Sequence, residues 1–193
     1  MAESVSVRDF VLLGYRAFDG AIRGKTMLQK RMYFLSVFLN VDLGYGPHYY
    51  GPYSSAVATA NTELKTLGLL QEFSTSWGVD HRGFEMARYD YFLSEIGRHL
   101  AESATARYPE VSEGIQRTAK IIEQAGDLNY MELSIAAKAF FALRRLQGSA
   151  TLEQIEELLP KFGWNVSHEE LEKATSFLAK AGLVSRRASS GAA

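Results

Sequence analysis

The apolar residues in the first third of the chain recur every three or four positions, the period of helices that bury one face. Ser6 marks the start of the first predicted helix, and Thr26 is the predicted N-cap of a second helix that ends near Asn40. A third helix is predicted from Ser54 or Ser55, with Gly68 just past its end. The apolar faces expected toward the core are Leu28, Met32 and Leu35 in the second helix and Val57, Ala60, Leu64 and Leu67 in the third.

The pattern then changes to residues typical of β-strands. Residues 69–77 and 84–94 are rich in such residues, and the polar stretch Gly78–Gly83 between them holds two glycines. These features predict a β-hairpin with a long tip. Two further helices are predicted, one opened by Ser94 and one over residues 109–124. The order helix, helix, helix, hairpin, helix is typical of a winged helix-turn-helix protein, mainly α with a minor β part.

The last third of the chain predicts three more helices. One covers residues 131–148, and two others start at capping boxes, in which a Ser or Thr is followed three residues later by Gln or Glu. The end of the third helix, from Val57 to Leu70, matches the segment from Leu171 to Val184 at an offset of 114 residues. We therefore expect a winged-helix-like domain over 1–126 with its wing at about 69–93, a helix-turn-helix-like unit over 127–187 packed on it, and a flexible tail over 188–193.

The composition of the chain excludes several kinds of functional site. The chain has 193 residues, a net charge of −1 and no cysteine. The absence of cysteine excludes disulfides, thiol catalysis and cysteine zinc sites. The four histidines have no metal-ligand spacing. No apolar run reaches the roughly 20 residues that cross a membrane, so a cytoplasmic protein is expected. A nearly neutral chain does not by itself indicate nucleic-acid binding, so any basic face must be local.

The segment Gly20–Met27, GAIRGKTM, resembles a phosphate-binding loop. That loop needs four residues between its first glycine and Gly-Lys-Ser/Thr, and here only three separate Gly20 from Gly24. A helix rather than a strand is expected before it. We therefore predict a glycine-rich turn between two helices, with a nucleotide-binding enzyme as a remote alternative.

Basic residues around this turn and on the predicted wing favour contact with DNA phosphates. The third helix would be the recognition helix, although its outer face carries mostly hydroxyls. The same residues are also typical of a solvated charged face. The candidate nucleic-acid-binding residues are Arg23, Lys25, Lys30, Arg31, Ser55, Thr59, Lys65, Arg82 and Arg88.

The stretch Tyr45–Tyr53, YGPHYYGPY, holds four tyrosines, one histidine and two Gly-Pro pairs. Tyrosine has a large apolar ring with a polar tip, so it suits either a lid over the core or a partner-binding surface. Both interpretations stay open. The candidate partner-binding residues are Tyr45, His48, Tyr49, Tyr50, Tyr53 and Trp77.

Three short motifs resemble the YwgA-like proteins and the related Panacea group of SocA-type antitoxins and adaptors. They are Leu28-Gln29-Lys30 followed by Tyr33, then Gly51-Pro52-Tyr53-Ser54, then Leu67-Gly68-Leu69. The resemblance covers about residues 24–72. It implies a winged-helix-like fold and a regulatory or defence-associated binding role without chemistry or cofactor.

Two hypotheses follow from these observations. The first is a regulatory protein that contacts DNA through residues 23–31 and the wing. The second is a protein–protein adaptor or antitoxin, whose partner would be a toxin or a protease substrate. The winged-helix order favours DNA, whereas the near-neutral charge and the weakly charged third helix favour the adaptor. Either protein would be non-enzymatic, and the sequence leaves a homodimer open.

Overall fold

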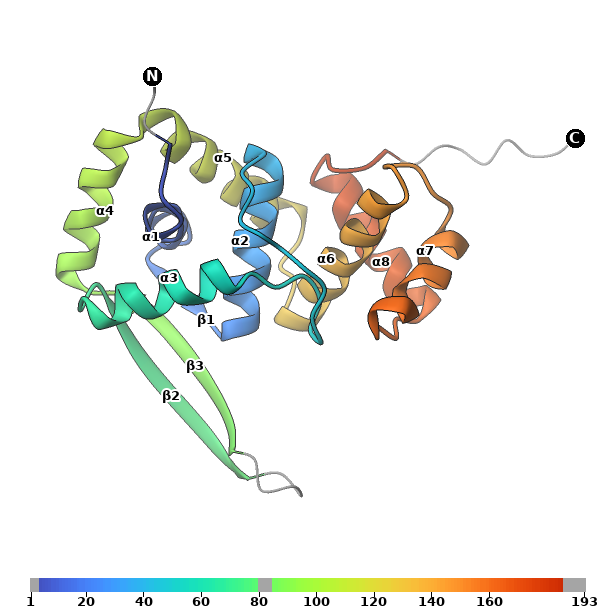
Figure 1. Cartoon of the computed structure of the whole chain (residues 1–193), viewed down its shortest axis with the longest axis horizontal. Coiled ribbons are helices and arrows are strands. Elements are labelled where there is room, and N and C mark those ends of the chain that lie inside the picture. The colour runs from blue at the N-terminus through green and yellow to red at the C-terminus, as the bar shows by residue number, and fades with distance from the viewer. Residues whose placement is uncertain (1–3, 80–84, 186–193) are drawn as a thin grey trace, which may run out of the picture.

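The structure is a computed structural model that describes residues 4–79 and 85–185. The protein is mainly helical, as the sequence pattern predicts, and the predicted hairpin is part of a small antiparallel sheet of three strands (Figure 1). The elements are α1 (Val7–Ala17), β1 (Ala21–Arg23), α2 (Lys25–Leu39), α3 (Ser55–Thr66), β2 (Leu70–Val79), β3 (Glu85–Leu93), α4 (Glu95–Arg107), α5 (Pro109–Ala125), α6 (Tyr130–Arg145), α7 (Leu152–Leu158), the 3₁₀ helix η1 (Leu159–Phe162) and α8 (His168–Lys180).

Serine and threonine side chains begin most of the helices where the sequence predicts. Ser6 accepts a hydrogen bond from the amide of Asp9 at α1, and Ser54 and Ser94 do the same at α3 and α4. Each hydroxyl satisfies an amide that has no partner within the helix. Both predicted capping boxes, at α7 and α8, are also formed.

The segment between α1 and α2 differs from the prediction. Ala21–Arg23 is a short strand, β1, rather than a simple turn, because it pairs with Asp90–Phe92 of β3. Helix α2 then starts directly, with Gly24 as its N-cap and no side-chain cap. The prediction that Thr26 caps this helix is therefore wrong, since Thr26 already lies inside its first turn.

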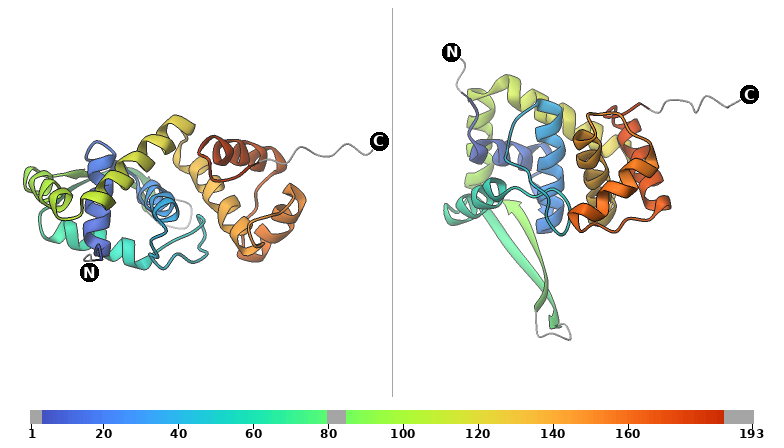
Figure 2. Two further views of the ribbon diagram at one scale, coloured as in Figure 1. Left: turned by 90° about the horizontal axis from the view of Figure 1, so that it is seen from above. Right: turned by 45° about the vertical axis from the view of Figure 1, so that its right-hand side comes forward.

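Helix α2 is the central helix of the protein. It packs against α1, α3, α5 and α6, which lie around it (Figures 1 and 2). Leu28, Met32 and Leu35 are buried as predicted, but the neighbouring helices bury most of its other faces as well. In α3 the predicted core residue Leu67 is exposed, because it is the C-cap residue and follows the last helical turn.

The hairpin of β2 and β3 projects from the helical body as a long arm (Figure 1). β1 pairs only with Asp90–Phe92, so the outer part of the arm is two-stranded. The predicted tip lies mostly at residues 80–84, outside the described residues. Two strands alone are marginally stable in water, so the base of the arm depends on its packing against the helices.

Helices α6, α7 and α8 lie together at one end of the body, and α1 and α4 lie at the other (Figures 1 and 2). α6 packs on α2, and α8 contacts α5. The predicted boundary at 126/127 falls in the loop between α5 and α6, but the two-domain division itself stays a prediction. The predicted flexible tail, 188–193, lies outside the described residues.

The helix ends that match at an offset of 114 residues have the same local structure. Gly68 and Gly182 both adopt positive φ, at 71° and 74°. The following residues, Leu69 and Leu183, donate backbone hydrogen bonds five residues back at 2.9 Å in both cases. The sequence match therefore reflects the same C-terminal structure in both helices, which end at a glycine with positive φ.

No helix in the described part of the chain is both long enough and apolar enough to cross a membrane.

Candidate functional site

Two of the sequence motifs that carry the family resemblance are bonded to each other. The Gln29 side chain pairs with the backbone of Ser54 twice: its Nε2 donates to the carbonyl oxygen at 3.0 Å, and its Oε1 accepts from the amide at 2.9 Å. Lys30 Nζ donates to the carbonyl oxygen of Pro52 at 2.7 Å. All of these groups are buried, so α2 fixes the backbone of the tyrosine-rich loop that leads into α3.

Lys30 does not lie on the exposed basic face that the sequence predicts. Its side chain is only 2% exposed, because the loop at Gly51 and helix α6 close over it. Burial and, second, the nearby ammonium of Lys138 lower the pKa of Lys30 to about 7. Lys30 therefore helps to hold the loop on α2, and its ammonium is not available to a phosphate.

Helix α6 and the end of η1 hold the same loop from the other side. Ser134 Oγ donates to the carbonyl oxygen of Tyr50, and Trp164 Nε1 donates to that of His48 at 2.6 Å. Trp164 is itself buried. The loop is therefore clamped between α2 and the C-terminal helices.

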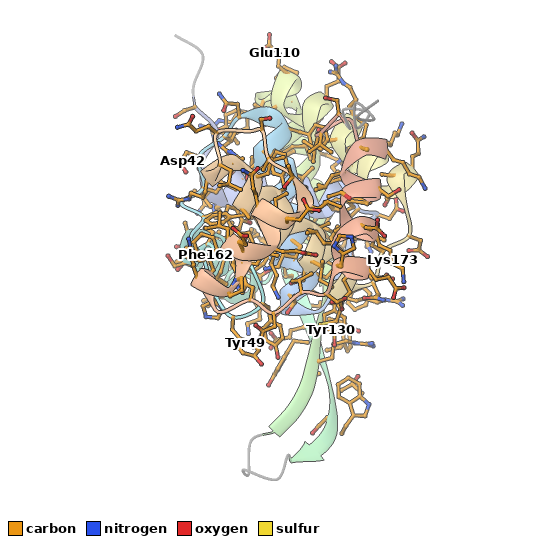
Figure 3. All side chains as sticks on the ribbon, turned by 90° about the vertical axis from the view of Figure 1, so that its right-hand side faces the viewer. Asp42, Tyr49, Glu110, Tyr130, Phe162 and Lys173 are labelled. Carbon is orange, nitrogen blue, oxygen red and sulfur yellow. The ribbon has the colours of Figure 1, made fainter. Side chains whose placement is uncertain are left out.

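The rings of this loop point in different directions. Tyr45 turns inward: its hydroxyl donates to the Gln29 carbonyl oxygen at 2.9 Å, and burial raises its pKa. Tyr45 is partly buried and its hydroxyl is bound inside the protein, so its predicted place on a contact surface stays a prediction. Tyr49 and Tyr50 are exposed, and Tyr49 is 73% exposed (Figure 3). The backbone of the loop is thus structural, while these two rings face outward.

A cleft of about 700 Å³ lies between the start of α2, helix α3, the clamped loop and the hairpin. It joins segments that are far apart in the sequence, including both the predicted basic turn and the predicted wing. Its lining includes the buried Lys30, three exposed basic residues and several aromatic ones, among them Arg23, Lys25, Tyr50, Trp77, Arg88 and Tyr130.

The charged side chains at the walls of the cleft are all basic. Arg23, Lys25 and Arg88 are exposed there, and among the described residues no Asp or Glu lines it. The Lys25 ammonium lies 3.9 Å from the centre of the Tyr89 ring. The Arg88 guanidinium lies 5.9 Å from the ring of Trp77 and forms an ion pair with an aspartate on β3 at 3.0 Å. The cleft is therefore a local basic site on a chain that is almost neutral.

The inner wall of the cleft is a polar network that holds α3 to the sheet. Tyr15 donates to Asn61 Oδ1 at 2.7 Å, and burial and then Glu72 raise the pKa of Tyr91 beside it. Lys65, predicted as a DNA contact, is half-buried and paired with Glu72 at 3.0 Å. That pairing offsets part of its charge, as the ion pair with Asp90 does for Arg88, and Lys65 does not line the cleft.

The other predicted contacts are not in the cleft. Ser55 and Thr59 are exposed, but they line a separate shallow depression together with Glu63. The guanidinium of Arg31 lies 4.2 Å above the ring of Phe18, away from the cleft lining. Arg82 lies outside the described residues. The structure thus joins Arg23, Lys25 and Arg88 into one site and separates the rest from it.

Three aromatic residues of the cleft are absent from the sequence-based candidates. Tyr89 and Tyr91 are two residues apart on β3, a spacing that places both rings on one face of a strand and that the sequence does display. Tyr130 begins α6, and no local pattern connects it with the hairpin. Tyr49 and Tyr130 both lie at the end of the body from which the hairpin projects (Figure 3).

Comparison with known proteins assigns no function to this site. No protein-family model matches the chain, and a search of curated proteins found no match. The resemblance to the YwgA-like and Panacea proteins therefore stays a prediction. Within residues 4–79 and 85–185, no three His, Asp or Glu side chains gather in a way that could hold a metal ion.

Proposed function

We propose that this protein is a non-enzymatic regulatory protein that binds nucleic acid at the cleft between α2, α3 and the hairpin. The observation that carries the proposal is the charge of the cleft. Arg23, Lys25 and Arg88 are exposed among its lining residues and no described Asp or Glu lines it, although Arg88 is ion-paired with Asp90 and acidic residues slightly outnumber basic ones in the whole chain. Such a local concentration of positive charge is what phosphate binding requires.

The arrangement of the elements supports the same function. Helix α3 follows α2 and the clamped loop and precedes a long hairpin, in the order of a winged helix-turn-helix protein. In that class α3 would approach the DNA while the wing contacts the backbone beside it. Arg23 lies opposite Asp90, two residues from Arg88 on β3, and Lys25 begins α2, so these cations would meet the DNA backbone near the base of the wing.

The test is fluorescence anisotropy of a labelled random-sequence DNA duplex, titrated with protein at about 50 and 200 mM salt. Binding should weaken steeply with salt. In the variants Arg23→Glu, Lys25→Glu and Arg88→Glu, the salt slope should fall by about 0.9 for each phosphate that the protein no longer neutralises. Lys120→Glu is the matched control, because Lys120 is exposed on α5 and does not line the cleft. Equal effects of all four reversals would refute the cleft as the site.

An adaptor that binds a protein partner is the second candidate. The observation in its favour is a group of exposed large side chains beside the cleft: Tyr49, Tyr50, Tyr130 and Met131. Tyrosine is enriched at the energetic centres of protein interfaces. The resemblance to the Panacea antitoxins favours this candidate as well. A folded protein that binds no nucleic acid at the lower salt would leave the adaptor as the better account.

A further inference from the structure

We infer that the cleft takes unpaired nucleotides, so that the protein prefers single-stranded nucleic acid to a duplex. The inference rests on the proposed function and names the form of nucleic acid that the cleft accepts. It depends on the aromatic residues of the cleft, whereas the proposed function depends on its charge.

Exposed rings stand at several points around the mouth of the cleft. Trp77 on the hairpin is 59% exposed, and Tyr50 of the clamped loop and Tyr130 of α6 are also exposed. Exposed rings beside cations are typical parts of single-strand binding sites. Every base has a face that stacks on such a ring, and its phosphate can meet the neighbouring cation.

Two of the basic residues of the cleft lie near aromatic rings of the hairpin. Lys25 lies over the ring of Tyr89, and Arg88 lies near the ring of Trp77. Single-strand binding sites pair backbone charges with stacking platforms in this way. An acidic peptide would also be attracted by the cations, but its carboxylates would not use the exposed ring faces. The observations therefore favour unpaired nucleotides over an acidic protein segment.

The size of the cleft agrees with unpaired bases. The cleft has a volume of about 700 Å³, within the range of pockets that hold single small organic molecules. The bases of a duplex stay stacked on one another, so they cannot lie on the rings of the cleft. A single strand can turn its bases into the cleft and onto the rings.

Tryptophan fluorescence gives a direct test because the two tryptophans differ in exposure. Trp77 is 59% exposed at the cleft, whereas Trp164 is 1% exposed and bonded to the loop. A single-stranded oligothymidine should quench Trp77 and bind at least about tenfold more tightly than a duplex of equal length at about 50 mM salt. In Trp77→Phe the remaining emission, from Trp164, should not change on binding.

Alanine variants of three exposed tyrosines test the stacking, and Tyr49 is the control for its neighbour Tyr50. Tyr50→Ala and Tyr130→Ala should each weaken single-strand binding by about 5- to 150-fold, the loss of one stacked base. Tyr49→Ala should change it by less than about twofold, since Tyr49 is exposed next to Tyr50 but does not line the cleft. All three rings are exposed, and circular dichroism would verify that each variant is folded.

Each outcome decides between the proposals. Duplex binding as tight as single-strand binding, without quenching of Trp77, would overturn this inference and leave the proposed function standing. Equal effects of Tyr49→Ala and Tyr50→Ala would overturn the cleft as the stacking site. No binding of either nucleic acid by the folded protein would overturn both the inference and the proposed function, and capture of a protein partner would then be the next experiment.

Discussion

Lys30 should make the fold more stable as the pH increases, because its surroundings lower the pKa of its ammonium. Its buried ammonium donates to the Pro52 carbonyl oxygen, and burial together with Lys138 lowers its pKa from 10.5 to about 7. Between these two values the unfolded chain binds more protons than the folded one. The free energy of unfolding therefore rises as the pH increases above 7 and levels off near the unfolded pKa.

The size of the effect follows from the two pKa values. A difference of one pKa unit corresponds to about 1.4 kcal/mol, so Lys30 should add about 2 kcal/mol of stability between about pH 7.5 and about pH 9.5. The variant Lys30→Met keeps an unbranched side chain of similar length but cannot titrate, so it should lack this gain. Urea unfolding followed by circular dichroism at both pH values measures the difference.

The comparison of wild type and variant isolates Lys30, because all other titrating groups are present in both proteins. Lys120→Met, on the exposed face of α5, is the control and should keep the gain of the wild type. Parallel stability profiles for wild type and Lys30→Met would refute the reasoning, since they would mean that the buried ammonium has an ordinary pKa.

Two further substitutions test the packing around the site. Gln29→Ala should lower the free energy of unfolding by about 2–5 kcal/mol in urea titrations, because it leaves the buried amide and carbonyl of Ser54 without their partner; a loss below about 1 kcal/mol would contradict the clamp. Gly97→Ala should cost about 1–3 kcal/mol or more in thermal unfolding, since its Cβ would lie 2.1 Å from the Leu69 carbonyl oxygen. Gly114→Ala, whose Cβ meets only the end of a leucine side chain at 3.3 Å, should change stability by less than about 1 kcal/mol, and equal losses for both glycines would argue against the close contact.

Helix starts were the most predictable part of this protein. Ser6, Ser54, Ser94, Thr151 and Ser167 each accept the amide three residues later, as their sequence context indicates. The reason is that a cap and the amide it satisfies lie within one turn, so no distant segment takes part. The hairpin was predictable on similar grounds, because its two strands are neighbours in the sequence.

Features that depend on distant segments were missed. Strand β1 has three residues, too few to show a period, and it exists because β3 arrives beside it almost seventy positions later. Lys30 has the sequence position of an exposed helix residue, but it is buried by a loop and by α6, which the helical pattern of α2 does not encode. The charge of Lys30 predicted that its side chain is exposed, but packing between distant segments buries it.

The sequence by itself determined the helices, their serine and threonine caps and the hairpin, whereas the bonds that join α2 to the tyrosine-rich loop appear only in the structure. Only the tertiary structure decided that Arg23, Trp77, Arg88 and Tyr130 share one cleft. Helical period and capping arise from contacts within a turn, so they can be read along the chain. A cleft arises from packing between elements, and no local pattern states which faces of α2, α6 and the hairpin will meet.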